Sequence, residues 1–149
     1  MAVHTEGRRS NPGTKLVRSN GALIEQYFAA FNRREPQEML DLLSDDVVHE
    51  PSQGAARTGK RAFAEFLDHM NRCYVETIVE PVIMVSDDGD NAAAEFVVNG
   101  VYILTDEGFP RAVDQHYRIR AGAFFHIRDG KIARVGNHYN PADWIAQVS

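Results

Sequence analysis

Three side chains of the kinds that carry out acid–base chemistry stand in apolar stretches of this sequence. Glu95 lies among alanine, phenylalanine and valine residues, Glu50 lies between a histidine and a proline, and Tyr27 lies in a run rich in aromatic residues. A carboxylate beside a pocket can take a proton from a carbon next to a carbonyl group. A phenol can stabilise the oxygen that then becomes negatively charged.

Each of these side chains also has a purely structural explanation. The Tyr27 ring fits the core of an amphipathic helix, with its hydroxyl hydrogen-bonded. Glu50 fits a solvated strand end that precedes a proline loop. Glu95 fits an outward-facing position or an ion pair with one of three nearby arginines, Arg118, Arg120 and Arg134.

The histidines and the cysteine show no spacing typical of a metal site. The chain has six histidines, without a His-x-His or a His-Glu-x-x-His motif. It has one cysteine, Cys73, which excludes an internal disulfide and a cysteine-based zinc ribbon. We therefore expect no metal and no cofactor.

The apolar periodicity predicts the elements that must position these residues. Helical spacing begins near Ser19 or Asn20 and runs to Asn32, and two further helices are predicted over 36–43 and 58–74. A short strand is predicted over 47–50, between the second and third helices. Four longer strands follow the third helix, over 78–85, 92–104, 115–127 and 131–139. A short helix after Asn140 closes the chain. This order indicates an α+β fold, with the helices packed on one face of a curved sheet.

Length and charge indicate a single acidic domain. The chain has 149 residues, which suits one domain. Its net charge is −5, and the first 18 residues alone carry +3, which leaves −8 on the rest. An acidic body argues against nucleic-acid binding. We predict a disordered basic tail over residues 1–19 and one domain over residues 20–149.

The apolar residues are too scattered for a membrane protein. No stretch has the length of a membrane span. The first residues also lack the apolar region of a signal peptide. The sequence therefore predicts a cytoplasmic protein without a membrane partner.

Several short segments over roughly residues 20–145 form a pattern that is typical of one superfamily. They are Tyr27–Asn32, Leu42–Val47, His49–Pro51, Gly59–Phe63 and Phe124–Ile132. This pattern resembles the nuclear transport factor 2-like (NTF2-like) superfamily. Within it, the sequence is most similar to the SnoaL-like, ketosteroid isomerase-related proteins, through Ala93–Val98, Thr105–Gly108 and Ala121–Phe125. The resemblance implies a cone in which N-terminal helices and a curved, mainly antiparallel sheet enclose a pocket.

The same resemblance assigns roles to two of the candidate groups. The tyrosine that donates a hydrogen bond to the enolate oxygen in steroid isomerases falls on Tyr27, and their catalytic aspartate falls on Glu50. Their second acid falls on Ala123, whose methyl group cannot donate a hydrogen bond. The Asp-Arg-Asp set of the epoxide hydrolases with this fold is also absent, because its positions fall on Glu95, Val97 and Asn137.

The alignments with these relatives place the odd-numbered strand residues toward the pocket. The implied wall consists of Phe31, Phe63, Leu67, Val97, Asn99, Tyr117, Ala123, Phe125, Asn137 and Tyr139, and the implied catalytic groups are Glu50, Tyr27 and Glu95. Glu50 and Glu95 would then share an apolar pocket. Desolvation and a neighbouring like charge both raise the pKa of a carboxyl group, so this pair would hold one proton between them.

The expected function is acid–base chemistry of the isomerase, cyclase or hydratase type on a small hydrophobic molecule that bears a carbonyl group. The alternative is a non-catalytic binding or assembly module with the same fold. Relatives commonly pair through the outer face of the sheet. On the face opposite the implied pocket, this chain mixes aromatic and cationic side chains as interfaces do, at His116, Arg118, Arg120, Phe124 and His126. We therefore also expect a homodimer.

Overall fold

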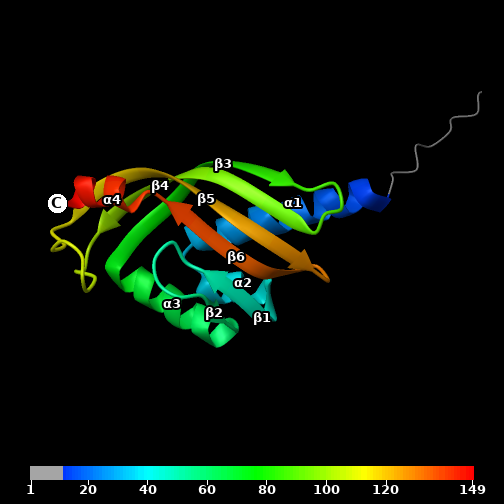
Figure 1. Cartoon of the computed structure of the whole chain (residues 1–149), viewed down its shortest axis with the longest axis horizontal. Coiled ribbons are helices and arrows are strands. Elements are labelled where there is room, and N and C mark those ends of the chain that lie inside the picture. The colour runs from blue at the N-terminus through cyan, green and yellow to red at the C-terminus, as the bar shows by residue number, and fades with distance from the viewer. Residues whose placement is uncertain (1–11) are drawn as a thin grey trace, which may run out of the picture.

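Four helices and a six-stranded sheet make up residues 12–149, the part of the chain that our computed structural model describes (Figure 1). The helices are α1 (Pro12–Asn32), α2 (Pro36–Asp41), α3 (Lys60–Cys73) and α4 (Pro141–Val148). The strands are β1 (Leu43–Glu50), β2 (Arg57–Thr58), β3 (Tyr74–Val85), β4 (Asn91–Tyr102), β5 (Gln115–Arg128) and β6 (Lys131–Tyr139). The predicted α+β class is confirmed.

The sheet is mostly antiparallel, with the strand order β2-β1-β6-β5-β4-β3. Strands β3 to β6 pair with one another in sequence, and β1 joins β6 in parallel. Asp129 and Gly130 make the tight turn between β5 and β6, with φ angles of 52° and 72°. The register of β3 against β4 shifts between Val79 and Val82, because Pro81 cannot donate a ladder hydrogen bond.

Helix α1 lies across the inner face of the sheet (Figure 1), and it begins earlier than the sequence pattern predicts. It starts at Pro12, since the first helical position suits proline. Residues 12–19 are therefore helical, and the prediction of a disordered tail is wrong for them. Asn20, predicted as a helix cap, is buried and donates from Nδ2 to the Gly89 carbonyl at 2.6 Å. Residues 1–11 of the predicted tail lie outside the described residues.

The antiparallel register decides which residues of β4 and β5 share a face. Ala94 pairs with Ala123, and Gly100 pairs with Tyr117. Even-numbered residues of β4 therefore lie beside odd-numbered residues of β5, which face inward as predicted. The inner face of β4 carries Ala92, Ala94, Phe96, Val98 and Tyr102. The prediction that the odd-numbered residues of β4 face inward is wrong.

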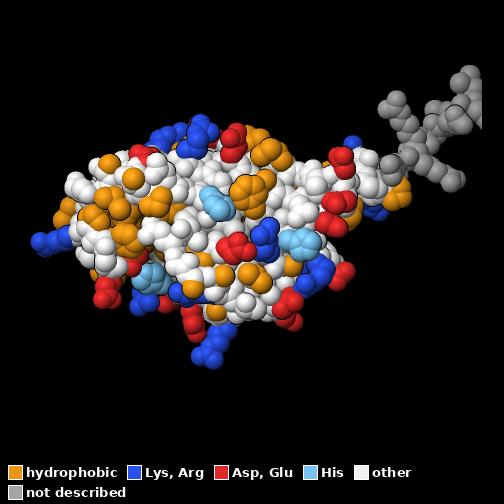
Figure 2. Space-filling view, in the orientation of Figure 1, with side chains coloured by type: hydrophobic (Ala, Val, Ile, Leu, Met, Phe, Trp, Pro, Cys, Tyr) orange, Lys and Arg blue, Asp and Glu red, His pale blue; other side chains and the backbone are white. Residues whose placement is uncertain are grey.

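The core lies between the inner face of the sheet and the helices. Phe28 of α1 packs against Phe96 and Phe125, with ring centroids 5.2 and 6.0 Å apart. Trp144 of α4 packs edge-on against Tyr102. Figure 2 shows the outer face of the sheet, where hydrophobic, charged and histidine side chains mix. No helix within residues 12–149 is long and apolar enough to cross a membrane.

Candidate functional site

A cavity of about 340 Å³ lies between α1, α3 and the inner face of the sheet. Aromatic rings form much of its wall, among them Tyr27, Phe28, Phe31, Phe63, Phe66 and Phe96. Polar side chains reach it at a few points, which include His49, His69, Glu76, Asp106 and Asn137. An apolar cavity with a few placed polar groups is the usual form of a small-molecule site.

Glu76 brings a carboxyl group to this cavity from the inner face of β3. It alternates with Tyr74 and Ile78, which are both buried. Glu76 Oε1 accepts a hydrogen bond from the Tyr117 hydroxyl at 2.5 Å. Burial raises the pKa of the Glu76 carboxyl, and the Tyr117 hydrogen bond and the charge of Arg34 offset part of that rise. A carboxyl group with a raised pKa suits proton transfer at neutral pH.

Gly100 makes the contact between Tyr117 and Glu76 possible. These three residues lie in one row across the sheet, because Gly100 of β4 pairs with Glu76 on one side and with Tyr117 on the other. The Tyr117 ring fills the space above Gly100, where a Cβ atom would lie 2.1 Å from the ring Cζ. The phenol therefore reaches across β4 to a carboxyl group two strands away.

His49 is buried at the edge of the cavity and holds the amide of Asn137. Its ring packs against Phe63 and Phe66, with centroids 4.7 and 4.5 Å away. His49 Nε2 lies 2.9 Å from Asn137 Oδ1, whereas the buried Nδ1 has no hydrogen-bond partner among the described residues. Burial lowers the pKa of His49 and so favours the neutral ring.

The unpartnered Nδ1 indicates which tautomer His49 adopts. A buried N–H without a partner is rarer in proteins than a buried acceptor without one. We therefore assign the proton to Nε2, which donates it to Asn137 Oδ1. The Asn137 side chain lines the cavity, and its amide nitrogen makes no hydrogen bond within residues 12–149. Its N–H groups are thus free to bind a molecule in the cavity.

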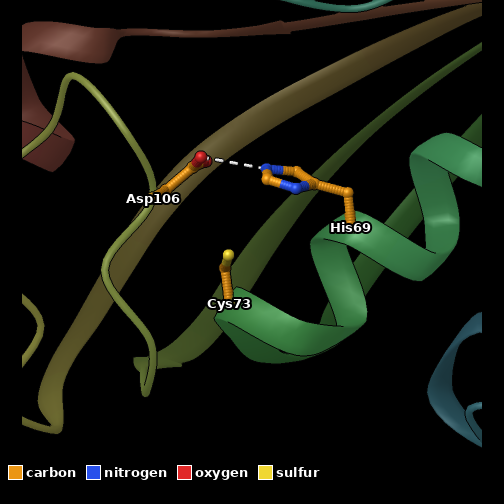
Figure 3. Close-up of side chains that lie close together, drawn as sticks. All are labelled: His69, Cys73 and Asp106. Carbon is orange, nitrogen blue, oxygen red and sulfur yellow. Dashed lines mark hydrogen bonds and ion pairs between the residues drawn. The ribbon is translucent and has the colours of Figure 1, made fainter.

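A second polar cluster lies where the end of α3 meets the loop after β4 (Figure 3). His69 Nε2 lies 2.9 Å from Asp106 Oδ1, and the Tyr74 hydroxyl donates to Asp106 Oδ2 at 2.8 Å. The backbone N–H of Asp106 donates to the Tyr102 hydroxyl at 2.8 Å. Cys73 projects toward the same place from the last turn of α3.

Six residues predicted for the site line the cavity: Tyr27, Phe31, Phe63, Leu67, Asn137 and Tyr139. Burial raises the pKa of Tyr27, so its phenol stays protonated, and its hydroxyl makes no hydrogen bond within residues 12–149. The Tyr139 hydroxyl accepts a hydrogen bond from Gln53 at 2.8 Å. Three other predicted residues face inward but are buried in the core: Tyr117, Ala123 and Phe125.

Two predicted catalytic residues, Glu50 and Glu95, lie on the outer face of the sheet. Glu50 Oε1 lies 3.4 Å from Arg134 Nη1, and the Glu50 side chain is 45% exposed. Glu95 Oε2 lies 3.9 Å from Arg120 Nη1, and the Glu95 side chain is 57% exposed. The prediction of a shared apolar pocket for Glu50 and Glu95 is wrong, because each carboxylate pairs with an arginine on the side away from the cavity.

Val97 and Asn99, predicted for the cavity wall, share the outer face with Glu95. Val97 is buried there at the pairing position of Val79. Asn99 Oδ1 accepts a hydrogen bond from Arg118 at 2.9 Å. The prediction failed for both residues for the same reason as for Glu95, namely that the register gives the inner face of β4 to its even-numbered residues.

Sequence reasoning missed Glu76 and His49, although strand alternation could have found both. His49 lies two residues after the buried Val47, on the same face of β1. Glu76 lies on the same face of β3 as Ile78, two residues before it. The predicted strand begins at residue 78 and therefore does not include Glu76. The contact between His69 and Asp106 joins positions 37 residues apart through a loop, and no periodic pattern signals it.

Comparisons with known proteins agree with this architecture. A family model for a SnoaL-like domain matches residues 24–135. No curated protein matches the chain. A solved structure named "putative polyketide cyclase", from Xanthomonas campestris pv. campestris, is 46% identical with a TM-score of 0.88, over 90% of this chain and 99% of that one.

Two further solved structures share the fold at higher and lower sequence identity. A protein with the same name from Pseudomonas putida is 49% identical, with a TM-score of 0.86 over 87% of this chain and 98% of that one. An LEH-like epoxide hydrolase from M. tuberculosis is 16% identical and shares the fold, with a TM-score of 0.67 over 89% of this chain and 90% of that one. The family match covers most of the chain, and the chain therefore belongs to the SnoaL-like family of the NTF2-like superfamily.

Proposed function

We propose that the chain is an acid–base enzyme that moves a proton on a small hydrophobic molecule bearing a carbonyl group, with Glu76 as the proton acceptor. The observation that carries this proposal is the partly buried Glu76 carboxyl group, which lines an aromatic cavity and is held by Tyr117. Glu50 and Glu95 cannot take this role, because their carboxylates lie on the other face of the sheet.

In the proposed step, Glu76 takes a proton from a carbon next to the carbonyl group, and the carbonyl oxygen gains the charge of an enolate. The Tyr117 hydroxyl holds Oε1, so Oε2 is the oxygen that accepts the proton. Return of that proton to a different carbon isomerises the molecule. Attack of the enolate carbon on the carbon of a second carbonyl group closes a ring, and the alkoxide that forms takes the proton back from Glu76.

Two hydrogen-bond donors on the cavity wall can serve the enolate oxygen. One is the Asn137 amide, whose orientation His49 fixes, and the other is the protonated Tyr27 phenol. In steroid isomerases, the second acid donates such a hydrogen bond from the position that Ala123 occupies here. The Asn137 amide and the Tyr27 phenol would take over that role. A donor of this kind contributes ~10²–10³ to kcat in enzymes that stabilise an oxyanion.

The lining and the size of the cavity support a neutral, flat, aromatic or polyketone substrate. Its volume of about 340 Å³ lies at the small end of the ~300–1,000 Å³ range of ligand sites. Arg57 reaches the cavity from β2, where its guanidinium stands over the Phe66 ring. Relatives that are 46% and 49% identical carry the name "putative polyketide cyclase", which agrees with a substrate that has several carbonyl groups.

We also propose that two copies of the chain pair through the outer face of the sheet. Phe124, Val82 and Met84 are each about half exposed on that face, and Val82 pairs with Glu95 between β3 and β4. Apolar centres with charged surroundings are typical of interfaces. Light scattering should give the mass of a dimer, and Phe124→Asp should give a monomer that keeps the activity. A monomeric wild type would contradict this pairing.

Replacing Glu76 by Gln tests the proposed function. Glu95→Gln is the matched control, because it removes the same carboxylate from the outer face. The assay follows the exchange of α-hydrogens for solvent deuterium in aryl ketones and β-diketones, starting with benzoylacetone. Trp144 is the only tryptophan of the chain and lines the cavity, so quenching of its fluorescence reports binding separately.

Glu76→Gln should keep the fluorescence quenching and lose ~10²–10⁴ of the exchange rate, the contribution of a positioned general base. Glu95→Gln should keep the wild-type rate. An unchanged rate in Glu76→Gln would contradict the role of Glu76. Quenching without exchange across the wild-type panel would favour the non-catalytic binding module.

A further inference from the structure

We infer that His69, Cys73 and Asp106 form a binding site for a zinc ion at the edge of the cavity. One nitrogen, one sulfur and one oxygen atom from these side chains lie within 4.8 Å of one another (Figure 3). Imidazole, thiolate and carboxylate are the ligands that zinc takes in proteins. The inference goes beyond the proposed proton transfer and does not depend on Glu76.

Two of the ligands come from one face of α3. His69 and Cys73 are four residues apart, so their side chains project from the same side of the helix. The end of this helix is tied to the chain that leads to the third ligand. The Cys73 carbonyl accepts hydrogen bonds from the backbone N–H groups of Ile103 and Leu104, at 2.9 and 3.3 Å. These bonds fix the distance between the helix and the loop that carries Asp106.

The carboxyl group of Asp106 is held in one orientation. The Tyr74 hydroxyl donates to Oδ2 at 2.8 Å, and the Asp106 backbone N–H donates to the Tyr102 hydroxyl at 2.8 Å. Oδ1 is thereby directed to His69. Outer hydrogen bonds of this kind orient the ligands of metal sites and commonly change metal affinity when they are removed.

The spacing of the three atoms suits a tetrahedral ion. Zinc bonds of ~2.0–2.3 Å place neighbouring ligand atoms ~3.3–3.6 Å apart. The His69–Asp106 separation is now 2.9 Å, and the largest separation in the cluster is at most 4.8 Å. Rotations of the side chains are enough to close these differences. The ion would replace the direct hydrogen bond between His69 and Asp106.

The fourth position of such an ion would face the cavity. His69 and Asp106 both line the cavity, whereas Cys73 is buried behind them. Zinc with three protein ligands keeps an open position that water or a ligand oxygen can occupy. The structure therefore assigns this cluster as a site where a carbonyl or hydroxyl oxygen of a bound molecule could meet a metal.

Cobalt substitution tests the site on the full chain. After treatment with a chelator, the protein is titrated with Co²⁺ and then with Zn²⁺. Cys73 is the only cysteine of the chain, so a thiolate-to-cobalt charge-transfer band can arise from no other residue. We expect this band to saturate at one Co²⁺ per chain and to disappear when Zn²⁺ is added.

Variants separate a metal site from a simple hydrogen-bonded pair. Cys73→Ser should abolish the band, and His69→Gln should bind Co²⁺ much more weakly. Tyr74→Phe should weaken binding by ~10–100-fold, as expected for an outer hydrogen bond, while it keeps the band. His116→Gln, which changes an exposed histidine of β5 outside the cluster, should behave as the wild type.

Thermal unfolding provides a second readout. Zn²⁺ should raise the unfolding temperature of the wild type and of His116→Gln, but not that of His69→Gln. The His69 side chain is 46% exposed, so the glutamine variant should fold. Absence of the band, or a band that His69→Gln leaves unchanged, would overturn the site. Deuterium exchange by the metal-free protein still tests Glu76, so the two proposals can fail separately.

Discussion

Glu76 and Glu95 are identical side chains on neighbouring strands, and the two faces of the sheet give them opposite surroundings. Glu95 is more than half exposed, and its carboxylate pairs with Arg120 at 3.9 Å. Glu76 is partly buried, and its carboxyl group accepts a hydrogen bond from a neutral phenol. An exposed ion pair contributes at most ~1 kcal/mol to stability. A buried carboxyl group with a raised pKa is a typical acid–base group. The face of the strand, rather than the residue type, decides which glutamate can do chemistry.

Among the substitutions that would change the surroundings of Glu76, we expect one at Gly100 to have the largest effect. A Cβ atom there would overlap the Tyr117 ring, so Gly100→Ala should push the phenol away from Glu76. We expect a loss of ~1–3 kcal/mol in the free energy of unfolding, typical of overpacking, and a large loss of exchange activity. Urea unfolding and the deuterium assay measure these two effects.

Gly21→Ala is the control for Gly100→Ala. A Cβ atom at position 21 would lie 3.8 Å from the nearest side-chain atom, which is an ordinary contact, and the site is helical. This variant should be as stable as the wild type or up to ~1 kcal/mol more stable. Equal behaviour of the two variants would contradict the placement of Tyr117 over Gly100.

Tyr117→Phe sharpens the comparison by changing only the hydrogen bond to Glu76. This bond lowers the pKa of the Glu76 carboxyl and so opposes the effect of burial. Its removal should raise that pKa further and move the acid limb of the pH–rate profile to higher pH. A hydrogen bond to a charged group contributes ~1.5–3 kcal/mol, which corresponds to a shift of ~1–2 pH units. An unshifted limb would show that another group controls the rate.

The pH dependence of stability gives the smallest effect. The unfolded Glu76 side chain loses its proton near the ordinary value of ~4.3, whereas the native one holds it to higher pH. Glu76 therefore stabilises the fold fully below that value, and its contribution is lost as the pH rises through the raised native pKa. Glutamine does not titrate, so Glu76→Gln should gain stability relative to the wild type over this range. Urea unfolding at several pH values checks this, and a constant difference would contradict it.

The sequence predicted the fold better than it predicted the site. Periodicity placed β6 at 131–139 and the turn at Asp129–Gly130, because alternation and turn residues are local signals. The faces of β4 depend on its register with β5, which only the assembled sheet defines. A shift of one residue in an alignment moves every side chain to the opposite face, and that shift brought Glu95 into the predicted site. Glu76 was lost in turn because β3 begins four residues before the predicted strand.

A titration of the Glu76 carboxyl carbon by NMR tests the central claim most directly. Glutamate labelled at the carboxyl carbon gives one signal per residue, and the signal that is missing in Glu76→Gln identifies position 76. We predict that this signal titrates above the ordinary glutamate value of ~4.3, because burial opposes the charged form. A midpoint at or below the ordinary value would show that Glu76 is a solvated carboxylate, and it would contradict its assignment as the acid–base group of the cavity.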